Sequence, residues 1–199
     1  MKKLIFLLFL GCTQIAWAQE SHPKTARSNK FPLVVSVNFN AVSTPFHKPG
    51  NNLKNLGLRV GTELPYNKKG NLFQTVNVGY YRNRLNGDGI YLNSEFGYRP
   101  NLYKGFGPEF KLGPGFANIY LPTKPLETDG KGNWKQATNT GKTAFQVHGS
   151  LGLQYHNLTR SQVDVSPFVQ YEIVGVAGYN KTIPLLPTSF IHAGCRLKF

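Results

Sequence analysis

The sequence predicts an all-β fold, an eight-stranded antiparallel up-and-down transmembrane β-barrel. Three observations lead to this prediction. Apolar and polar residues alternate at every second position through eight segments, as they do in strands with two different faces. No window after residue 18 stays apolar long enough for a transmembrane helix. The chain is rich in Gly, Tyr and Phe and poor in Met and Trp, a composition typical of strands and turns.

The start of the chain has the features of a secretory signal peptide, predicted to span residues 1–18. Two lysines and an apolar run precede Ala-Trp-Ala at residues 16–18, which fits a small-x-small cleavage site. Lipidation at Cys12 is the alternative interpretation. Cleavage before Gln19 would leave 181 of the 199 residues, with 21 Lys and Arg against 9 Asp and Glu, or a charge of about +12. Cys195 would then have no disulfide partner.

The rest of the chain is predicted to form one domain. Residues 19–30 are polar, basic and without periodicity, which favours a flexible N-terminal tail. The barrel is predicted over residues 31–199. Its expected strands are approximately residues 33–43, 54–64, 72–82, 90–99, 105–116, 143–155, 163–174 and 187–199. Eight is an even number, as single-chain bacterial barrels require.

The connections between these strands are expected to alternate in length. Residues 44–53, 122–142 and 175–186 are long, whereas most of the others are short, including a tight hairpin at residues 83–89. This asymmetry fits long loops at one end of the barrel and short turns at the other, beside both termini. Three prolines interrupt strand patterns and predict bulges or rim positions: Pro108, Pro114 and Pro167.

The last segment, residues 187–199, carries the clearest resemblance to a known family. Its apolar face ends on Cys195, Leu197 and Phe199, and the other face holds His192 and Arg196. It resembles the closing strand of bacterial outer-membrane β-barrels, which typically ends on an aromatic residue. The resemblance implies that the protein is exported through a cleaved signal peptide and inserted in the outer membrane of a Gram-negative envelope.

The acids agree with an inside-out barrel. When the apolar faces are turned outward, all five acids in strands fall on the inward face, and a charge at the bilayer midplane would cost about 2–4 kcal/mol. We therefore predict a lumen charge network of Arg59, Glu63, Glu95, Arg99, Glu109, Lys111, Asp164, Glu172 and Arg196. Eight strands leave no room for a water channel, because side chains fill so narrow an interior. A pore or proton path has no sequence feature of its own.

One constellation has the residue types of a nucleophilic site. His148 and Ser150 share the inward face of one strand, and Glu172 is expected opposite them on the next. The order of these three catalytic candidates resembles that of the outer-membrane lipid A deacylases, which carry their site on the lipid-facing wall. The alternative is a hydrogen-bonded cluster in the lumen. The histidines have no metal-ligand spacing, and no cofactor is expected.

The sequence favours a non-enzymatic outer-membrane protein with basic extracellular loops and a structural or interaction role in the envelope. The loop cations are Lys48, Lys124, Lys131, Lys135 and Lys181. Expected partners are outer-membrane lipid and lipopolysaccharide, with an extracellular or periplasmic protein as a second option and no nucleic acid. The alternatives are a lipid-acting barrel enzyme and a soluble exported β-barrel binder.

Overall fold

The structure is a computed structural model that describes most of the chain after residue 30. The described residues are 31–42, 55–67, 69–84, 86–100, 102, 105–123, 126–130, 132–136, 138, 141–156, 163–178 and 185–199. The predicted signal peptide and tail lie outside this set, as do Lys48, Lys124, Lys131 and Lys181. None of the described residues forms a helix long and apolar enough to cross a bilayer.

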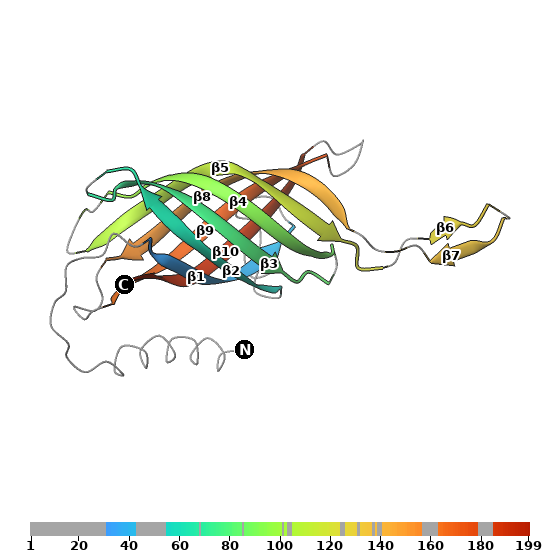
Figure 1. Cartoon of the computed structure of the whole chain (residues 1–199), viewed down its shortest axis with the longest axis horizontal. Coiled ribbons are helices and arrows are strands. Elements are labelled where there is room, and N and C mark those ends of the chain that lie inside the picture. Colours follow the sequence, from blue (N-terminus) through green and yellow to red (C-terminus); the bar gives the residue numbers. More distant parts are fainter. Residues whose placement is uncertain are drawn as a thin grey trace.

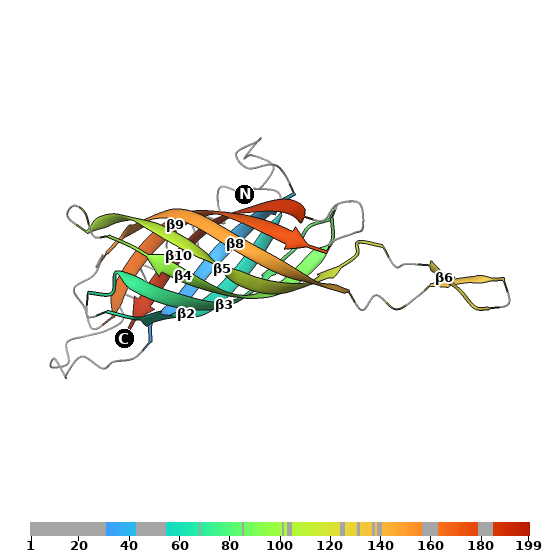
Figure 2. The ribbon, with the colours of Figure 1, turned by 90° about the horizontal axis from the view of Figure 1, so that it is seen from above.

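Eight antiparallel strands close into a barrel (Figures 1 and 2). They are β1 (Leu33–Ala41), β2 (Leu56–Pro65), β3 (Leu72–Tyr81), β4 (Asp88–Tyr98), β5 (Phe106–Tyr120), β8 (Lys142–Tyr155), β9 (Asp164–Ala177) and β10 (Leu185–Lys198). Each barrel strand pairs with its neighbours along the chain, apart from the inserted β6 and β7, and β10 closes on β1. The predicted all-β, eight-stranded, up-and-down barrel is confirmed.

The seam between the first and last strands is paired along the whole of β1. β1 and β10 run antiparallel from Leu33 opposite Leu197 to Ala41 opposite Ser189. The alternation that marked residues 187–199 therefore belongs to the strand that closes the barrel. Because no barrel strand keeps a free edge, the backbone donors and acceptors of the wall can be satisfied without water.

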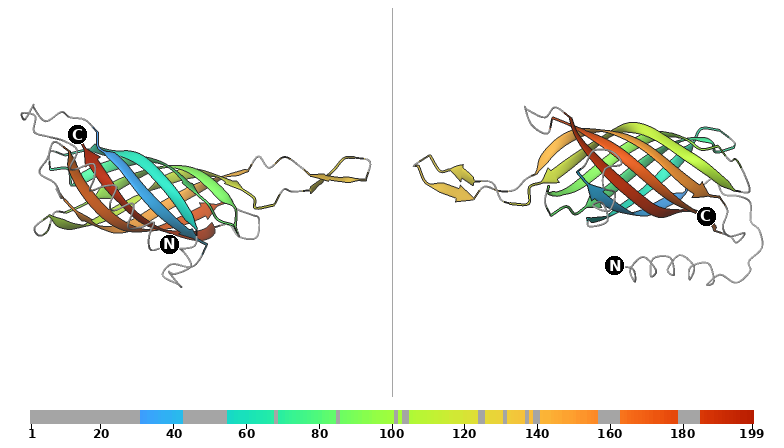
Figure 3. Two further views of the ribbon diagram at one scale, coloured as in Figure 1. Left: turned by 90° about the horizontal axis from the view of Figure 1, so that it is seen from below. Right: turned by 180° about the vertical axis from the view of Figure 1, so that it is seen from behind.

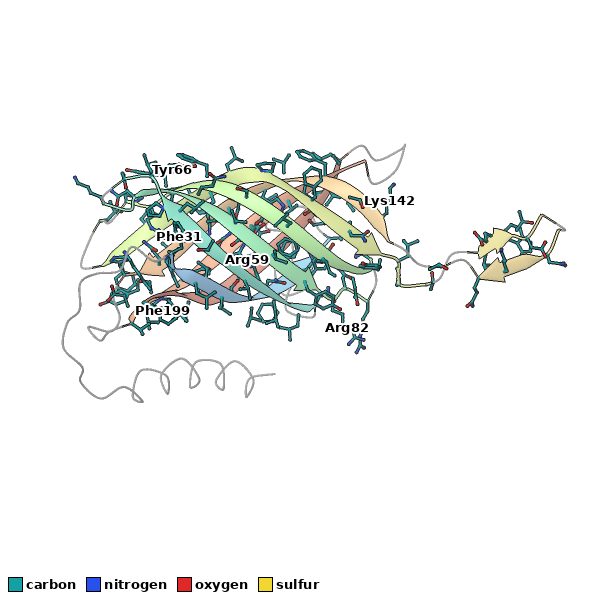
Figure 4. The ribbon with its side chains drawn as sticks, in the orientation of Figure 1. Phe31, Arg59, Tyr66, Arg82, Lys142 and Phe199 are labelled. Carbon is teal, nitrogen blue, oxygen red and sulfur yellow. The ribbon has the colours of Figure 1, made fainter. Side chains whose placement is uncertain are left out.

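The two ends of the barrel differ (Figure 3). The ends of β3, β5 and β9 and the starts of β4, β8 and β10 lie at one end, which we call the loop end. The start of β1 and the C-terminal residue Phe199 lie at the other, which we call the terminal end. In Figure 4 Arg82 and Lys142 are at the loop end, and Tyr66 and Phe199 are at the terminal end.

β5 shows how the barrel accommodates proline. It runs past Pro108 and Pro114 and ends at Tyr120, four residues beyond the predicted end at residue 116. The β4–β5 ladder has paired residues at Asn93 opposite Gly115 and at Phe96 opposite Leu112, with none in between. This interruption falls at Pro114, which has no N–H group to donate.

The connection from β5 to β8 was predicted as a long one, and the structure adds two short strands that the sequence did not indicate. It contains a separate two-stranded sheet of β6 (Leu126–Thr128) and β7 (Trp134–Gln136), which lies beyond the loop end (Figures 1 and 2). Three-residue strands are too short to give an alternation that can be detected in the sequence.

The two faces of the wall have opposite polarity. Exposed apolar side chains cover the outside, and they include Leu58, Leu92, Phe96, Phe106, Phe110, Leu112, Phe116, Leu151 and Leu153. Charged and amide side chains point inward and are buried, as Figure 4 shows for Arg59. A water-soluble barrel requires the reverse arrangement, so this is the wall of a transmembrane β-barrel.

Aromatic rings inside the barrel lie over glycines of the neighbouring strand. In the β3–β4 ladder, Gly79 is opposite Tyr91, and the same ladder pairs Phe73 with Gly97 and Tyr81 with Gly89. A Cβ atom added at Gly79 would lie 2.2 Å from the ring atom Cζ of Tyr91. The glycine therefore provides the space that the ring occupies in a narrow lumen.

We predict that Gly79→Ala lowers the free energy of unfolding by about 1–3 kcal/mol, because the ring of Tyr91 is packed and has nowhere to move. Gly149→Ala in β8 is the matched control, since its Cβ would meet only Leu112 Cδ1, at 3.8 Å. Urea unfolding in detergent micelles or vesicles measures both. Equal stability of the two variants would contradict this account of the aromatic–glycine pairs.

Candidate functional site in the barrel lumen

The lumen is filled by three successive layers of side chains. A charged cluster lies toward the terminal end, a histidine–carboxylate cluster lies in the middle, and an apolar layer lies toward the loop end. Each layer contains residues from several strands, so the layers form only when the barrel closes. We describe them in this order.

The first layer, which we call the terminal cluster, consists of Glu63, Arg99, Glu109, Lys111 and Arg196. Arg99 and Arg196 each bridge the two carboxylates, with distances from 2.6 Å for Arg99–Glu63 to 3.2 Å for Arg99–Glu109. Lys111 Nζ lies 2.8 Å from Glu109 Oε1. Every member therefore has at least one partner of opposite charge.

Aromatic rings and an amide support the terminal cluster. The guanidinium of Arg99 lies over the ring of Phe73, 4.0 Å from its centroid, and that of Arg196 lies 5.7 Å from the centroid of Phe168. Arg196 Nη1 also donates a 2.7 Å hydrogen bond to Gln154 Oε1. The aromatic rings and the amide fix the orientation of the two guanidinium groups, and the carboxylates of the cluster balance their charge.

The second layer, which we call the central cluster, is organised around Glu172, whose side chain is 1% exposed. Its carboxylate lies 3.0 Å from Arg59 Nη1, 2.5 Å from His148 Nδ1 and 2.7 Å from His192 Nε2. Arg59 also donates hydrogen bonds to Gln170 and to Ser36. One carboxylate of β9 thus joins side chains of β2, β8 and β10.

Glu95 lies beside the central cluster and is held by neutral groups. Thr75 Oγ1 and Asn77 Nδ2 each lie 3.4 Å from its Oε2. Asn77 Nδ2 also donates to Asn93 Oδ1 at 2.9 Å, and Asn93 Nδ2 lies 3.2 Å from His148 Nδ1. This amide chain connects Glu95 to the central cluster.

The third layer is apolar and closes the lumen toward the loop end. Tyr81, Tyr91 and Phe190 pack at ring-centroid distances of 5.3–6.3 Å. Buried aliphatic side chains complete this apolar layer: Ala117, Ile119, Ala144, Val174 and Val176. A continuous water path along the barrel axis would have to cross these rings.

The charges inside the lumen balance. Among the described residues, the inward carboxylates (Glu63, Glu95, Glu109 and Glu172) equal the inward cations (Arg59, Arg99, Lys111 and Arg196) in number, and all of them except Glu95 have an ion-pair partner. Buried charges are tolerated when they are paired and hydrogen-bonded, and removal of one partner leaves the other uncompensated. These residues come from five strands, β2, β4, β5, β9 and β10, so the arrangement can fix the positions of these strands relative to one another.

Seven of the nine residues of the expected charge network lie in these clusters, Glu95 lies beside the central cluster, and Asp164 lies apart. Asp164 is half-buried at the start of β9, opposite Lys198 and outside both clusters. His192 was not proposed as a site residue, although the alternation of its strand placed it on the polar, inward face. The register places Phe190 opposite Glu172, which brings His192 of β10 within reach of that carboxylate. Only the strand pairing could have identified this contact.

The three catalytic candidates lie near one another but do not form a nucleophilic relay. His148 contacts Glu172 through Nδ1. Its Nε2 lies beside Gly115, since a Cβ atom added to that glycine would be only 2.5 Å from Nε2. Gly115 pairs with Gln146, on the side of His148 away from Ser150. Ser150 Oγ has no hydrogen-bond partner among the described residues. The group is buried in the lumen, so the geometry gives no support to a lipid-acting site on the outer wall.

No group of three or more His, Cys, Asp or Glu residues in the described part of the chain is arranged to hold a metal ion. The two histidines of the central cluster are instead directed at a carboxylate. The cluster is therefore best described as a polar network inside a packed barrel.

Comparison with solved structures shows that the fold of this chain is similar to that of small outer-membrane β-barrels. Neisserial surface protein A matches with a TM-score of 0.56 and 15% identity, over 85% of this chain and 97% of that one. Ail, the attachment invasion locus protein of Yersinia pestis, matches with a TM-score of 0.50 and 13% identity, over 85% and 97%. Identities this low establish the fold alone. No protein-family model and no curated protein matches the chain.

We predict that Glu172→Gln lowers the free energy of unfolding by about 3–5 kcal/mol, because Arg59 would remain buried without its counter-charge. The exposed pair of Glu127 and Lys135, 3.3 Å apart, provides the control: Glu127→Gln should change stability by less than about 1 kcal/mol. The double variant Arg59→Met/Glu172→Met should be less destabilised than Glu172→Gln. Wild-type stability of Glu172→Gln in urea unfolding would contradict the role of the central cluster.

Proposed function

We propose that the protein is a non-enzymatic protein of the bacterial outer membrane, in which a closed barrel anchors an interaction surface at the loop end. The main observation that supports this proposal is the polarity of the wall, which has exposed apolar side chains such as Leu112 outside and charged side chains inside. Acyl chains are the environment in which such a surface is stable. Export through a cleaved signal peptide, with a mature chain that starts at Gln19, is part of this proposal.

The packed lumen supports an anchoring role rather than a transport role. The apolar layer around Tyr81, Tyr91 and Phe190 lies above two clusters of paired side chains. An ion entering from either end would have to break buried ion pairs or cross packed rings, and both are costly. The functional surfaces are therefore expected at the ends of the barrel.

The loop end is the more basic candidate surface. Arg82 and Arg84, in the turn between β3 and β4, and Lys142, at the start of β8, are exposed there. Guanidinium groups bind phosphate well because they present several donors in a fixed plane. These residues are positioned to contact the phosphates of lipopolysaccharide or an anionic partner outside the cell.

The two alternative functions have weaker support. A lipid-acting enzyme would need Ser150 within reach of His148 Nε2, which points the other way. A soluble exported binder would need a polar outer wall, whereas Leu92 and Phe110 are about half exposed on this one.

We expect the protein in the outer-membrane fraction, with gel migration that changes on heating and an N-terminal sequence that begins at Gln19. Arg82→Gln/Arg84→Gln should weaken binding of the purified barrel to lipopolysaccharide about thirtyfold at low salt, since each of the two cations near an anionic surface contributes about 1 kcal/mol. Lys69→Gln/Lys198→Gln removes two exposed cations at the terminal end and should have no effect.

A freely soluble periplasmic protein would refute the proposed location. If the terminal-end variant weakened lipopolysaccharide binding as much as the loop-end variant, the loop end would not be the contact surface.

A further inference from the structure

The hairpin of β6 and β7 has two faces of different chemistry. Leu126 lies opposite Gln136, Thr128 opposite Trp134, and Glu127 opposite Lys135. Paired residues share a face, so Leu126 and Trp134 lie on one side as diagonal neighbours, and the Glu127–Lys135 ion pair lies on the other. Because Trp134 is 72% exposed and Leu126 is 63% exposed, nothing described covers the apolar face.

We propose that this apolar face inserts into an anionic lipid surface that lies opposite the loop end, such as a second membrane. The proposal rests on the proposed function, because it requires the barrel to be inserted with its loop end outward. The hairpin lies beyond the loop end along the barrel's long axis (Figures 1–3). It therefore extends away from the bilayer that the barrel would span.

The size of the face favours lipid over a protein partner. One Trp and one Leu present only ~300 Å² of apolar surface, whereas a stable protein interface buries ~800 Å² on each partner. Two such side chains are enough for shallow insertion at a membrane interface, where Trp is enriched. Three-residue strands also offer little edge for the addition of a partner strand.

The charges near the hairpin favour an anionic surface. Residues 121–142 contain four lysines and two acids. Glu127 is paired with Lys135, and Asp129 accepts hydrogen bonds from the backbone N and side-chain Nδ2 of Asn133, so the segment keeps a net charge of +2. The exposed arginines in the β3–β4 turn add to the positive potential of the loop end. Such cations attract anionic headgroups over about a Debye length.

The chain provides its own reporter for this proposal. Of its two tryptophans, one lies in the predicted signal peptide, so Trp134 is the single tryptophan of the chain that begins at Gln19. Its fluorescence shifts to the blue when the indole leaves water. The chain from Gln19, inserted in phosphatidylcholine nanodiscs, can therefore be titrated with vesicles of phosphatidylcholine alone or mixed with phosphatidylglycerol.

We expect a blue shift and co-flotation with the anionic vesicles and neither with the zwitterionic ones. Trp134→Ser should reduce co-flotation about tenfold, and Leu126→Ser should remove the shift, because each removes part of the inserted face. Glu127→Gln changes the opposite face and should bind at least as tightly as wild type.

Three results would overturn the inference. A blue shift in the nanodisc before vesicles are added would place the hairpin on the protein's own bilayer. If no vesicle changed the fluorescence or floated with the protein, the partner of the apolar face would be a protein and not lipid. If zwitterionic vesicles gave the same response as anionic ones, the cations would have no role in binding. Heat-dependent gel migration of the same sample reports barrel insertion separately, so failure of the proposed function can be distinguished from failure of this inference.

Discussion

The pairing of β1 with β10 is the constraint on which the rest of the structure depends. It closes the sheet from Leu33 opposite Leu197 to Ala41 opposite Ser189 and removes every free edge of the barrel wall. Once the sheet is closed, the period of two sorts each strand into an inner and an outer face. The apolar face can then meet acyl chains, and the charged face is enclosed with its partners.

The contacts among the inward-facing side chains make the barrel rigid. Glu172 is held by groups from three other strands, and Arg99 and Arg196 link Glu63 to Glu109 across the lumen. The apolar layer then closes the lumen toward the loop end. A barrel filled in this way provides a fixed platform, and its variable chemistry is at the loops. The exposed apolar side chains of β6 and β7 lie on that side of the molecule.

Much of this fold could be predicted from the sequence, because alternation is a local signal. The inward parity of Glu95 and Glu172 follows from their apolar neighbours alone. The contacts inside the lumen depend on register, which is a tertiary property, so the pairing of His192 with Glu172 could not be predicted. The hairpin around Trp134 was missed because its strands are too short to alternate.

The central claim is that the outer wall faces acyl chains. The most direct test is to measure the accessibility of spin labels in β4 to oxygen and to nickel. In a Cys195→Ser background, single cysteines at Ile90, Leu92 and Phe96 would be labelled in the bilayer-inserted barrel, with exposed Arg84 as the aqueous reference. We predict high accessibility to oxygen and low accessibility to a water-soluble nickel complex at all three wall positions. Nickel accessibility at Leu92 equal to that at Arg84 would contradict the account.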